Sequence, residues 1–245
     1  MVEVIKVISD LHIGVKGTKE NDFKLDEDKF KDYLLSLVDK CSMIVLLGDV
    51  FDLLQSEKFN DQETRLREII KDRMGLYGAL VSMIVRGDIV YVNGNHDAFM
   101  RTNKVFSKIV PKLVHKTPHH ILVFDHGHRA DIFNGMFSNF ISWIVGWLER
   151  IGFVDIDKDA PKLLKAMETN KNIDSVYIKY AKKLQERYTA DMVVLGHTHN
   201  AMVKEVGDLT YVNSGKGCDR KNKFDETTII VKGQNIEVKQ EIITL

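Results

Sequence analysis

Seven residues of this chain have side chains that bind divalent metals, and they occur in five short polar clusters. They are Asp10, His12, Asp49, Asn95, His126, His197 and His199. Carboxylate, imidazole and amide groups are the oxygen and nitrogen ligands that divalent transition metals take in proteins. Seven such ligands suit two cations better than one. Asp49 is the candidate for a carboxylate shared by both cations, because it is the only acid of its cluster that directly follows an apolar run and a glycine.

Each polar cluster comes directly after a short apolar run rich in valine and isoleucine. The runs cover residues 4–8, 43–47, 89–92, 121–124 and 192–195. Runs of this length and composition predict buried strands. Further strands are predicted at 209–213 and in a hairpin around 232–235. Open α/β sheets assemble their sites beyond the carboxyl ends of the strands, so we expect the five clusters to lie close together.

Helices are predicted between the strands, because apolar residues recur there at helical spacing. The patterns fall at residues 30–38, 66–70 and 77–84. Strands that alternate with helices indicate an α/β fold class. The chain has 245 residues, of which 44% are hydrophobic, enough for one large core. We therefore expect a single domain over 1–245, interrupted by a helical insertion at about 130–190, where no strand pattern occurs.

The predicted insertion contains an apolar and aromatic stripe over residues 133–151, which includes Trp143 and Trp147. Its most apolar part, 140–148, is far shorter than the roughly 20 residues that a membrane span requires. One interpretation is a helix packed on the domain. The other is an apolar lid that contacts a lipid-linked substrate or makes peripheral contact with a membrane surface.

Charge and cysteine usage narrow the class of protein. Lysine plus arginine number 35 and aspartate plus glutamate also number 35, so the formal net charge is zero. This balance argues against a dedicated nucleic-acid binder, and we expect no stable nucleic-acid complex. Cys41 and Cys218 are far apart and lack a CxxC partner, which favours two reduced thiols. Because charged residues interrupt the apolar start of the chain, we predict a first strand there and a cytoplasmic protein.

The complete motif series resembles the calcineurin-like metallophosphoesterases. It consists of Asp10-x-His12, Gly48-Asp49, Gly94-Asn95-His96-Asp97, His126-Gly127 and Gly196-His197-x-His199. The resemblance implies a four-layer αββα sandwich and a site for two divalent cations, with manganese preferred and iron, zinc or nickel as alternatives. Carried over by position, Asp10, His12, Asp49 and His199 hold one cation. Asp49, Asn95, His126 and His197 hold the other.

The same resemblance implies a metal-dependent phosphoesterase, in which a hydroxide between the cations attacks phosphorus. His96 then stabilises the phosphoryl charge or protonates the leaving group, and Asp97 orients the His96 imidazole. We interpret Asp52 as a supporting carboxylate and His119 and His120 as loop residues. His128 either touches substrate or supports His126.

Three interpretations of the substrate and activity stay open. Within the superfamily, the motif order and the helical insertion are similar to the UDP-2,3-diacylglucosamine hydrolases, which split a lipid-linked pyrophosphate. Those enzymes carry Arg where this chain has His96 and Asp where it has His128. A second interpretation is a metal-binding scaffold without catalysis, which would have no use for His96. A third interpretation is a nuclease, which would need a basic track to bind the phosphate backbone. Only four basic residues cluster, and they form either a solvated loop or a site for a second phosphate of the substrate: Lys216, Arg220, Lys221 and Lys223.

Overall fold

The computed structural model describes residues 2–18, 21–54, 61–102, 108–131 and 173–245. The chain divides into two compact units. The larger unit comprises Met1–His126 and Leu184–Leu245, and the smaller comprises Gly127–Lys183. Most of the predicted helical insertion and the whole apolar stripe at 133–151 lie outside the described residues. Within those residues, no helix has both the length and the apolar character needed to cross a membrane.

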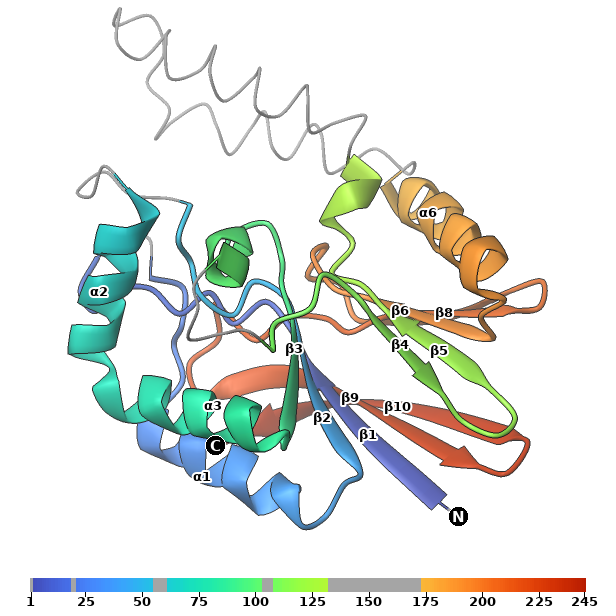
Figure 1. The fold of residues 1–245 in the computed structure, drawn as a ribbon, viewed down its shortest axis with the longest axis horizontal. Coiled ribbons are helices and arrows are strands. Elements are labelled where there is room, and N and C mark those ends of the chain that lie inside the picture. Colours follow the sequence, from blue (N-terminus) through green and yellow to red (C-terminus); the bar gives the residue numbers. More distant parts are fainter. Residues whose placement is uncertain (1, 19–20, 55–60, 103–107, 132–172) are drawn as a thin grey trace, which may run out of the picture. The chain divides into compact units, whose positions relative to one another are not determined.

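Two five-stranded sheets make up the larger unit (Figure 1). The first has the order β10-β9-β1-β2-β3. Its strands are β1 (Val2–Ile8), β2 (Met43–Leu47), β3 (Ile89–Val92), β9 (Lys223–Lys232) and β10 (Asn235–Thr244). Here β1, β2 and β3 are parallel, whereas β9 is antiparallel to both β1 and β10.

The second sheet has the order β4-β5-β6-β8-β7. Its strands are β4 (Leu113–Lys116), β5 (Ile121–Phe124), β6 (Met192–Leu195), β7 (Met202–Val206) and β8 (Leu209–Asn213). The central strands β5, β6 and β8 are parallel, and the two edge strands are antiparallel to their neighbours. The predicted α/β fold class, two mixed sheets flanked by helices, is confirmed.

The two sheets pack face to face through apolar side chains. Val7 and Val45 of the first sheet share one buried cluster with Phe124 and Val194 of the second. The opposite face of β1 and β2 is covered by helices, because Ile8, Ile44 and Leu46 belong to a second buried cluster with residues of α1 (Glu27–Val38) and α3 (Met74–Arg86). Strands buried on both faces have continuous apolar runs, which explains the uninterrupted sequence pattern of β2.

Local capping fixes where the helices start and stop. Asp26 caps α1 by accepting a hydrogen bond from the Lys29 amide, and Asp61 caps α2 (Gln62–Asp72) in the same way through Thr64. Helix α3 ends at Gly87, which has a left-handed φ of 90°. The described remainder contains α6 (Ile173–Tyr188), which spans the boundary between the two units, and two short 3-10 helices, η1 (Ala98–Thr102) and η3 (His128–Asp131).

The predicted strands and the three predicted helices are confirmed, whereas β4 and β7 were not predicted. These two strands lie at the edges of the second sheet. Most side chains of β7 are exposed, and none of those in β4 is fully buried. An edge strand that buries little has no need of an apolar run, so its sequence carries no strong strand signal.

Candidate metal centre

The parallel strand order brings the polar clusters together at the carboxyl ends of the strands. Asp10 and His12 follow β1, Asp49 follows β2, Asn95 follows β3, His126 follows β5, and His197 and His199 follow β6. The loops are joined by backbone hydrogen bonds, from the Asp10 amide to the Gly48 carbonyl at 3.0 Å and from the His12 amide to the Asp49 carbonyl at 2.9 Å. The Asp10 carboxylate also accepts the His197 amide at 3.1 Å, so the two sheets meet at this centre.

Asp49 lies at the middle of the cluster. Its Oδ2 is 3.0 Å from His126 Nε2 and 4.0 Å from His12 Nε2. Asp49 shares one group of potential ligands with Asp10 and His12, and a second with His126 and His197. Within each group the ligand atoms lie within 4.8 Å of one another. Asp49 is therefore placed where one carboxylate could serve two cations.

The remaining predicted ligands lie close to these two groups. His199 Nε2 is 3.3 Å from Asp10 Oδ1. Asn95 directly precedes His96, whose amide donates to Asp49 Oδ1 at 2.9 Å. All seven predicted ligands thus belong to loops that meet around Asp10 and Asp49. Ligation itself remains a prediction.

The backbone at this centre is strained. Five of the predicted ligands have a left-handed φ: Asp10 (54°), His12 (47°), Asp49 (49°), His197 (70°) and His199 (57°). This conformation is unfavourable for residues other than glycine, and sparsely populated conformations of this kind cost about 1–3 kcal/mol each. Such strain persists only where surrounding contacts enforce it, and it gathers at functional sites.

Two glycines allow the close approach of ligand side chains. A Cβ at Gly48 would lie 2.3 Å from His126 Nδ1, and a Cβ at Gly94 would lie 2.0 Å from Asp49 Oδ1. Both distances are far below van der Waals contact. Any larger residue at either position would therefore displace a predicted ligand.

The buried carboxylates of Asp10 and Asp49 favour positive charge at this site. Burial alone would raise the pKa of Asp49, but His126 outweighs it and the pKa falls below its usual value. Burial lowers the pKa of His126, but Asp49 and Asp10 outweigh it and raise the pKa to about 10. Carboxylates that stabilise an imidazolium so strongly would also stabilise a divalent cation.

Two buried polar atoms support a fit to metal ions. Within the described part of the chain, His12 Nε2 and Asn95 Oδ1 are buried without a hydrogen-bond partner. His126 Nδ1 donates to the Leu47 carbonyl at 2.9 Å, which leaves Nε2 as the nitrogen toward the carboxylates. Metal-binding histidines are held by such a bond through the other ring nitrogen. The donor set, imidazole nitrogens with carboxylate and amide oxygens, suits divalent transition metals.

The carboxylate beside His96 is Asp52 and not Asp97, which corrects the prediction for Asp97. His96 Nδ1 lies 3.0 Å from Asp52 Oδ1. Asp97 instead accepts hydrogen bonds from the Gly94 amide at 2.6 Å, the Val50 amide at 2.7 Å and the Tyr91 hydroxyl at 2.5 Å. Asp97 therefore holds the turn after β3 against the loop after β2. Burial and the nearby Asp49 raise the pKa of Asp97 to about 6.

Sequence reasoning missed the partner of Asp52. Arg65 of α2 is only 2% exposed, and its Nη2 lies 3.5 Å from Asp52 Oδ2. Asp52 thus contacts both Arg65 and His96, and the three side chains are largely buried. An arginine inside a helix rich in charged residues carries no signal of burial, so only the fold identifies it.

Cys218 is a second residue that sequence reasoning missed. The prediction of two free thiols is confirmed. Yet Cys218 is buried, and its sulfur belongs to a group of potential ligands with His12 and His199. No recognised spacing connects these three residues in the sequence, since they follow three different strands.

The other candidates have simpler surroundings. Lys216 pairs with Asp219 at 2.9 Å and Arg220 pairs with Asp225 at 2.7 Å, while Lys221 and Lys223 are exposed. His119 is exposed, as expected of a loop residue, and His120 is half-buried. His128 begins η3 in the smaller unit, and its role stays a prediction.

Comparison with known proteins identifies a family. Residues 4–235 match the calcineurin-like phosphoesterase superfamily domain. Three solved structures also match the chain. A predicted phosphoesterase from Streptococcus pneumoniae is 14% identical, with coverage of 100% of this chain and 90% of that chain and a TM-score of 0.49. Vacuolar protein sorting 29 from Cryptosporidium parvum is 14% identical, with coverage of 100% and 99% and a TM-score of 0.45. The phosphoesterase Yfce from E. coli is 14% identical, with coverage of 97% and 98% and a TM-score of 0.44. No curated protein matches the sequence.

Proposed function

The chain belongs to the calcineurin-like phosphoesterase superfamily, and we propose that it hydrolyses a phosphate ester or pyrophosphate with two divalent cations. Asp10, His12, Asp49 and His199 would hold one cation, and Asp49, Asn95, His126 and His197 the other. The observation that carries this proposal is the position of Asp49, which belongs to both ligand groups around it. When bound, the two cations would supply positive charge to the phosphoryl oxygens and an activated water as nucleophile.

The protein's own residues would prepare this chemistry. The His126 Nδ1 bond to the Leu47 carbonyl fixes the ring before any cation binds. The left-handed backbone at Asp10, His12 and Asp49 is enforced by hydrogen bonds between the loops, so the ligands need little reorganisation. A preorganised site stabilises the transition state without the cost of ordering its groups during the reaction.

His96 is the candidate for the group that acts on the leaving oxygen. Asp52 contacts Nδ1, so Nε2 is the ring nitrogen left for the substrate. The His96 side chain is 18% exposed, whereas the Asp52 side chain is 3% exposed. A histidine held by a buried carboxylate and open to solvent is suited to donate a proton or to stabilise phosphoryl charge. A scaffold without catalysis would not need this arrangement.

The substrate is proposed at two levels. The general proposal is a phosphate ester or pyrophosphate. The narrower one is a lipid-linked pyrophosphate of the UDP-2,3-diacylglucosamine type, supported by the order of motifs that includes Asp49 and Asp52. Asp52 contacts His96, so this motif is connected to the residue proposed to act on the leaving group. The UDP-2,3-diacylglucosamine hydrolases carry Arg at the position of His96.

A substrate screen tests both levels. The purified protein, loaded with Mn²⁺, would be assayed against p-nitrophenyl phosphate, bis-p-nitrophenyl phosphate, a nucleotide pyrophosphate and UDP-2,3-diacylglucosamine. We expect metal-dependent turnover of at least one substrate, and its loss in His96→Ala but not in the control His119→Ala. Metal binding without turnover of any of the four would favour the scaffold. Turnover of the small substrates alone would contradict the narrower proposal.

A further inference from the structure

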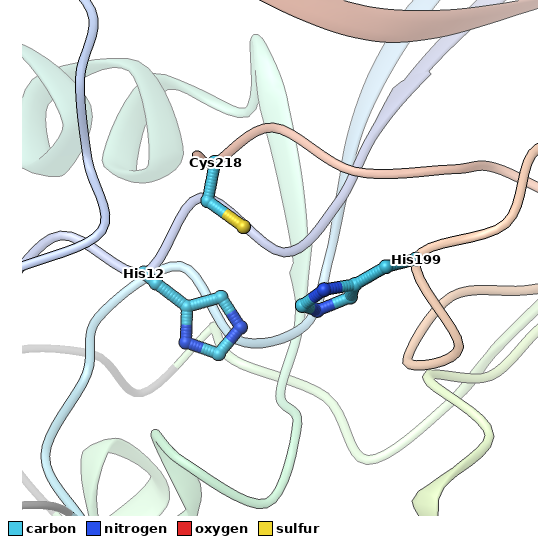
Figure 2. Close-up of side chains that lie close together, drawn as sticks. All are labelled: His12, His199 and Cys218. Carbon is cyan, nitrogen blue, oxygen red and sulfur yellow. The ribbon is translucent and has the colours of Figure 1, made fainter. Parts of the chain in front are cut away.

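Cys218, His12 and His199 form a cluster at the edge of the proposed metal centre. One ligand atom from each residue lies within 4.8 Å of the others. Figure 2 shows the sulfur of Cys218 turned toward the two imidazole rings, whose centroids are 5.4 Å apart. Cys218 is 1% exposed and His12 is 7% exposed. The thiol is therefore enclosed next to two predicted ligands.

The backbone holds Cys218 in this position. The segment after β8 is anchored to the loop after β1 by a 2.7 Å hydrogen bond between the hydroxyls of Ser9 and Ser214. The Gly217 amide donates to the Asp10 carbonyl at 3.2 Å. A Cβ at Gly217 would lie 2.8 Å from the Ser9 carbonyl oxygen, so only glycine permits this approach. Close backbone packing thus brings Cys218 to the loop that carries His12.

His12 provides an independent indication of a ligand. Its Nε2 is buried and has no hydrogen-bond partner among the described residues. Leaving a buried polar nitrogen unpaired is unfavourable, so such an atom indicates a partner beyond the protein itself. An imidazole nitrogen and a thiolate are both good ligands for zinc and similar cations.

We propose that Cys218 is an additional ligand of the cation assigned to Asp10, His12, Asp49 and His199, and that its thiolate makes this position prefer a thiophilic cation such as Zn²⁺ over Mn²⁺. This inference rests on the proposed function. Zinc bonds of about 2.3 Å to sulfur and about 2.0–2.1 Å to nitrogen separate neighbouring ligand atoms by about 3–4 Å at the bond angles of a five-coordinate site. The observed limit of 4.8 Å therefore requires only small side-chain movements. Binding would release the thiol proton to solvent.

Cobalt substitution tests the proposal directly. Metal-free wild type, Cys41→Ser and Cys218→Ser would be titrated with Co²⁺, and thiolate-to-cobalt charge-transfer absorption would be recorded in the near ultraviolet. The chain has two cysteines, so Cys41→Ser leaves Cys218 as its single thiol. Cys41 is a suitable control because its Sγ contacts the Leu37 carbonyl at the end of α1. We expect the absorption band in wild type and Cys41→Ser, and its loss in Cys218→Ser.

A second measurement concerns selectivity. The preference of the intact protein for Zn²⁺ over Mn²⁺, measured by competition, should fall about tenfold or more in Cys218→Ser and stay unchanged in Cys41→Ser. A Cys41→Ser protein that binds Co²⁺ without the band would overturn the inference and leave the proposed function intact. Wild type that binds no Co²⁺ would overturn both. The Cys41→Ser result stands even if Cys218→Ser folds poorly.

Discussion

Glycines serve different purposes at the metal centre and in the β7–β8 and β9–β10 hairpins of the larger unit. Gly94, after β3, has no room for a side chain, because a Cβ there would lie 2.0 Å from Asp49 Oδ1. Gly207 and Gly233 lie in the turns between β7 and β8 and between β9 and β10, and a Cβ at either would meet nothing within 4 Å. The hairpin glycines instead have left-handed φ values of 66° and 61°.

The position of these turns in the sheets explains the difference. The register pairs Val2 with Lys232, so the hairpin at Gly233 lies beside the amino end of β1. The amino ends of the parallel strands form the edge opposite the metal centre. At the carboxyl ends, five loops converge and the ligands themselves adopt the strained conformation. Thus most of the strain and crowding lie at the edge formed by the carboxyl ends of the strands (the crowded edge), whereas these two hairpins use ordinary turn chemistry.

The largest effect is expected from removing the Asp49 carboxylate, which lies at the crowded edge. Asp49→Ala should lose both cations and reduce turnover to background, because Asp49 is common to both ligand groups. Metal analysis after dialysis checks this, with the exposed hairpin variant Asp208→Ala as control. Two cations retained in Asp49→Ala would refute the shared-ligand assignment.

Crowding itself is tested by Gly94→Ala. The added methyl would meet both the side chain and, at 2.6 Å, the backbone nitrogen of Asp49. We expect a loss of stability of about 1–3 kcal/mol, as for other overpacked sites, together with impaired metal binding and most of the turnover lost. Thermal melts and metal analysis measure the two parts. Normal metal content in this variant would show that the approach of the two loops is not required.

A smaller loss is expected at His96, which belongs to the same edge but not to the proposed ligand set. His96→Ala should keep its metal content and lose about a hundredfold or more in turnover. The loss should be smaller for a good leaving group such as p-nitrophenol if His96 donates a proton. Equal losses for good and poor leaving groups would favour charge stabilisation instead.

The smallest effect is expected at the opposite edge. Gly233→Ala places a Cβ in open space, so its cost is the left-handed backbone alone, about 1 kcal/mol or about 2–4 °C in melting temperature for a chain of this size. Metal content and turnover should be unchanged. If Gly233→Ala impaired turnover as Gly94→Ala does, the distinction between the two edges would be wrong.

The sequence by itself determined the central strands and the positions of the polar clusters. Buried parallel strands require continuous apolar runs, and the polar residues that follow each run mark the point where the strand ends. The runs at 43–47, 89–92, 121–124, 192–195 and 209–213 coincide with β2, β3, β5, β6 and β8. Both signals are local, so they can be recognised without the tertiary structure.

Only the tertiary structure decided which side chains meet. Asp97 is adjacent to His96 in sequence, but its carboxylate turns back to the Gly94 and Val50 amides, and Asp52 from the neighbouring loop contacts His96 instead. Cys218 approaches His12 across more than 200 residues because β9 returns to pair with β1 and the segment before it packs on Ser9. These contacts depend on strand order and loop packing, which neither residue type nor spacing specifies.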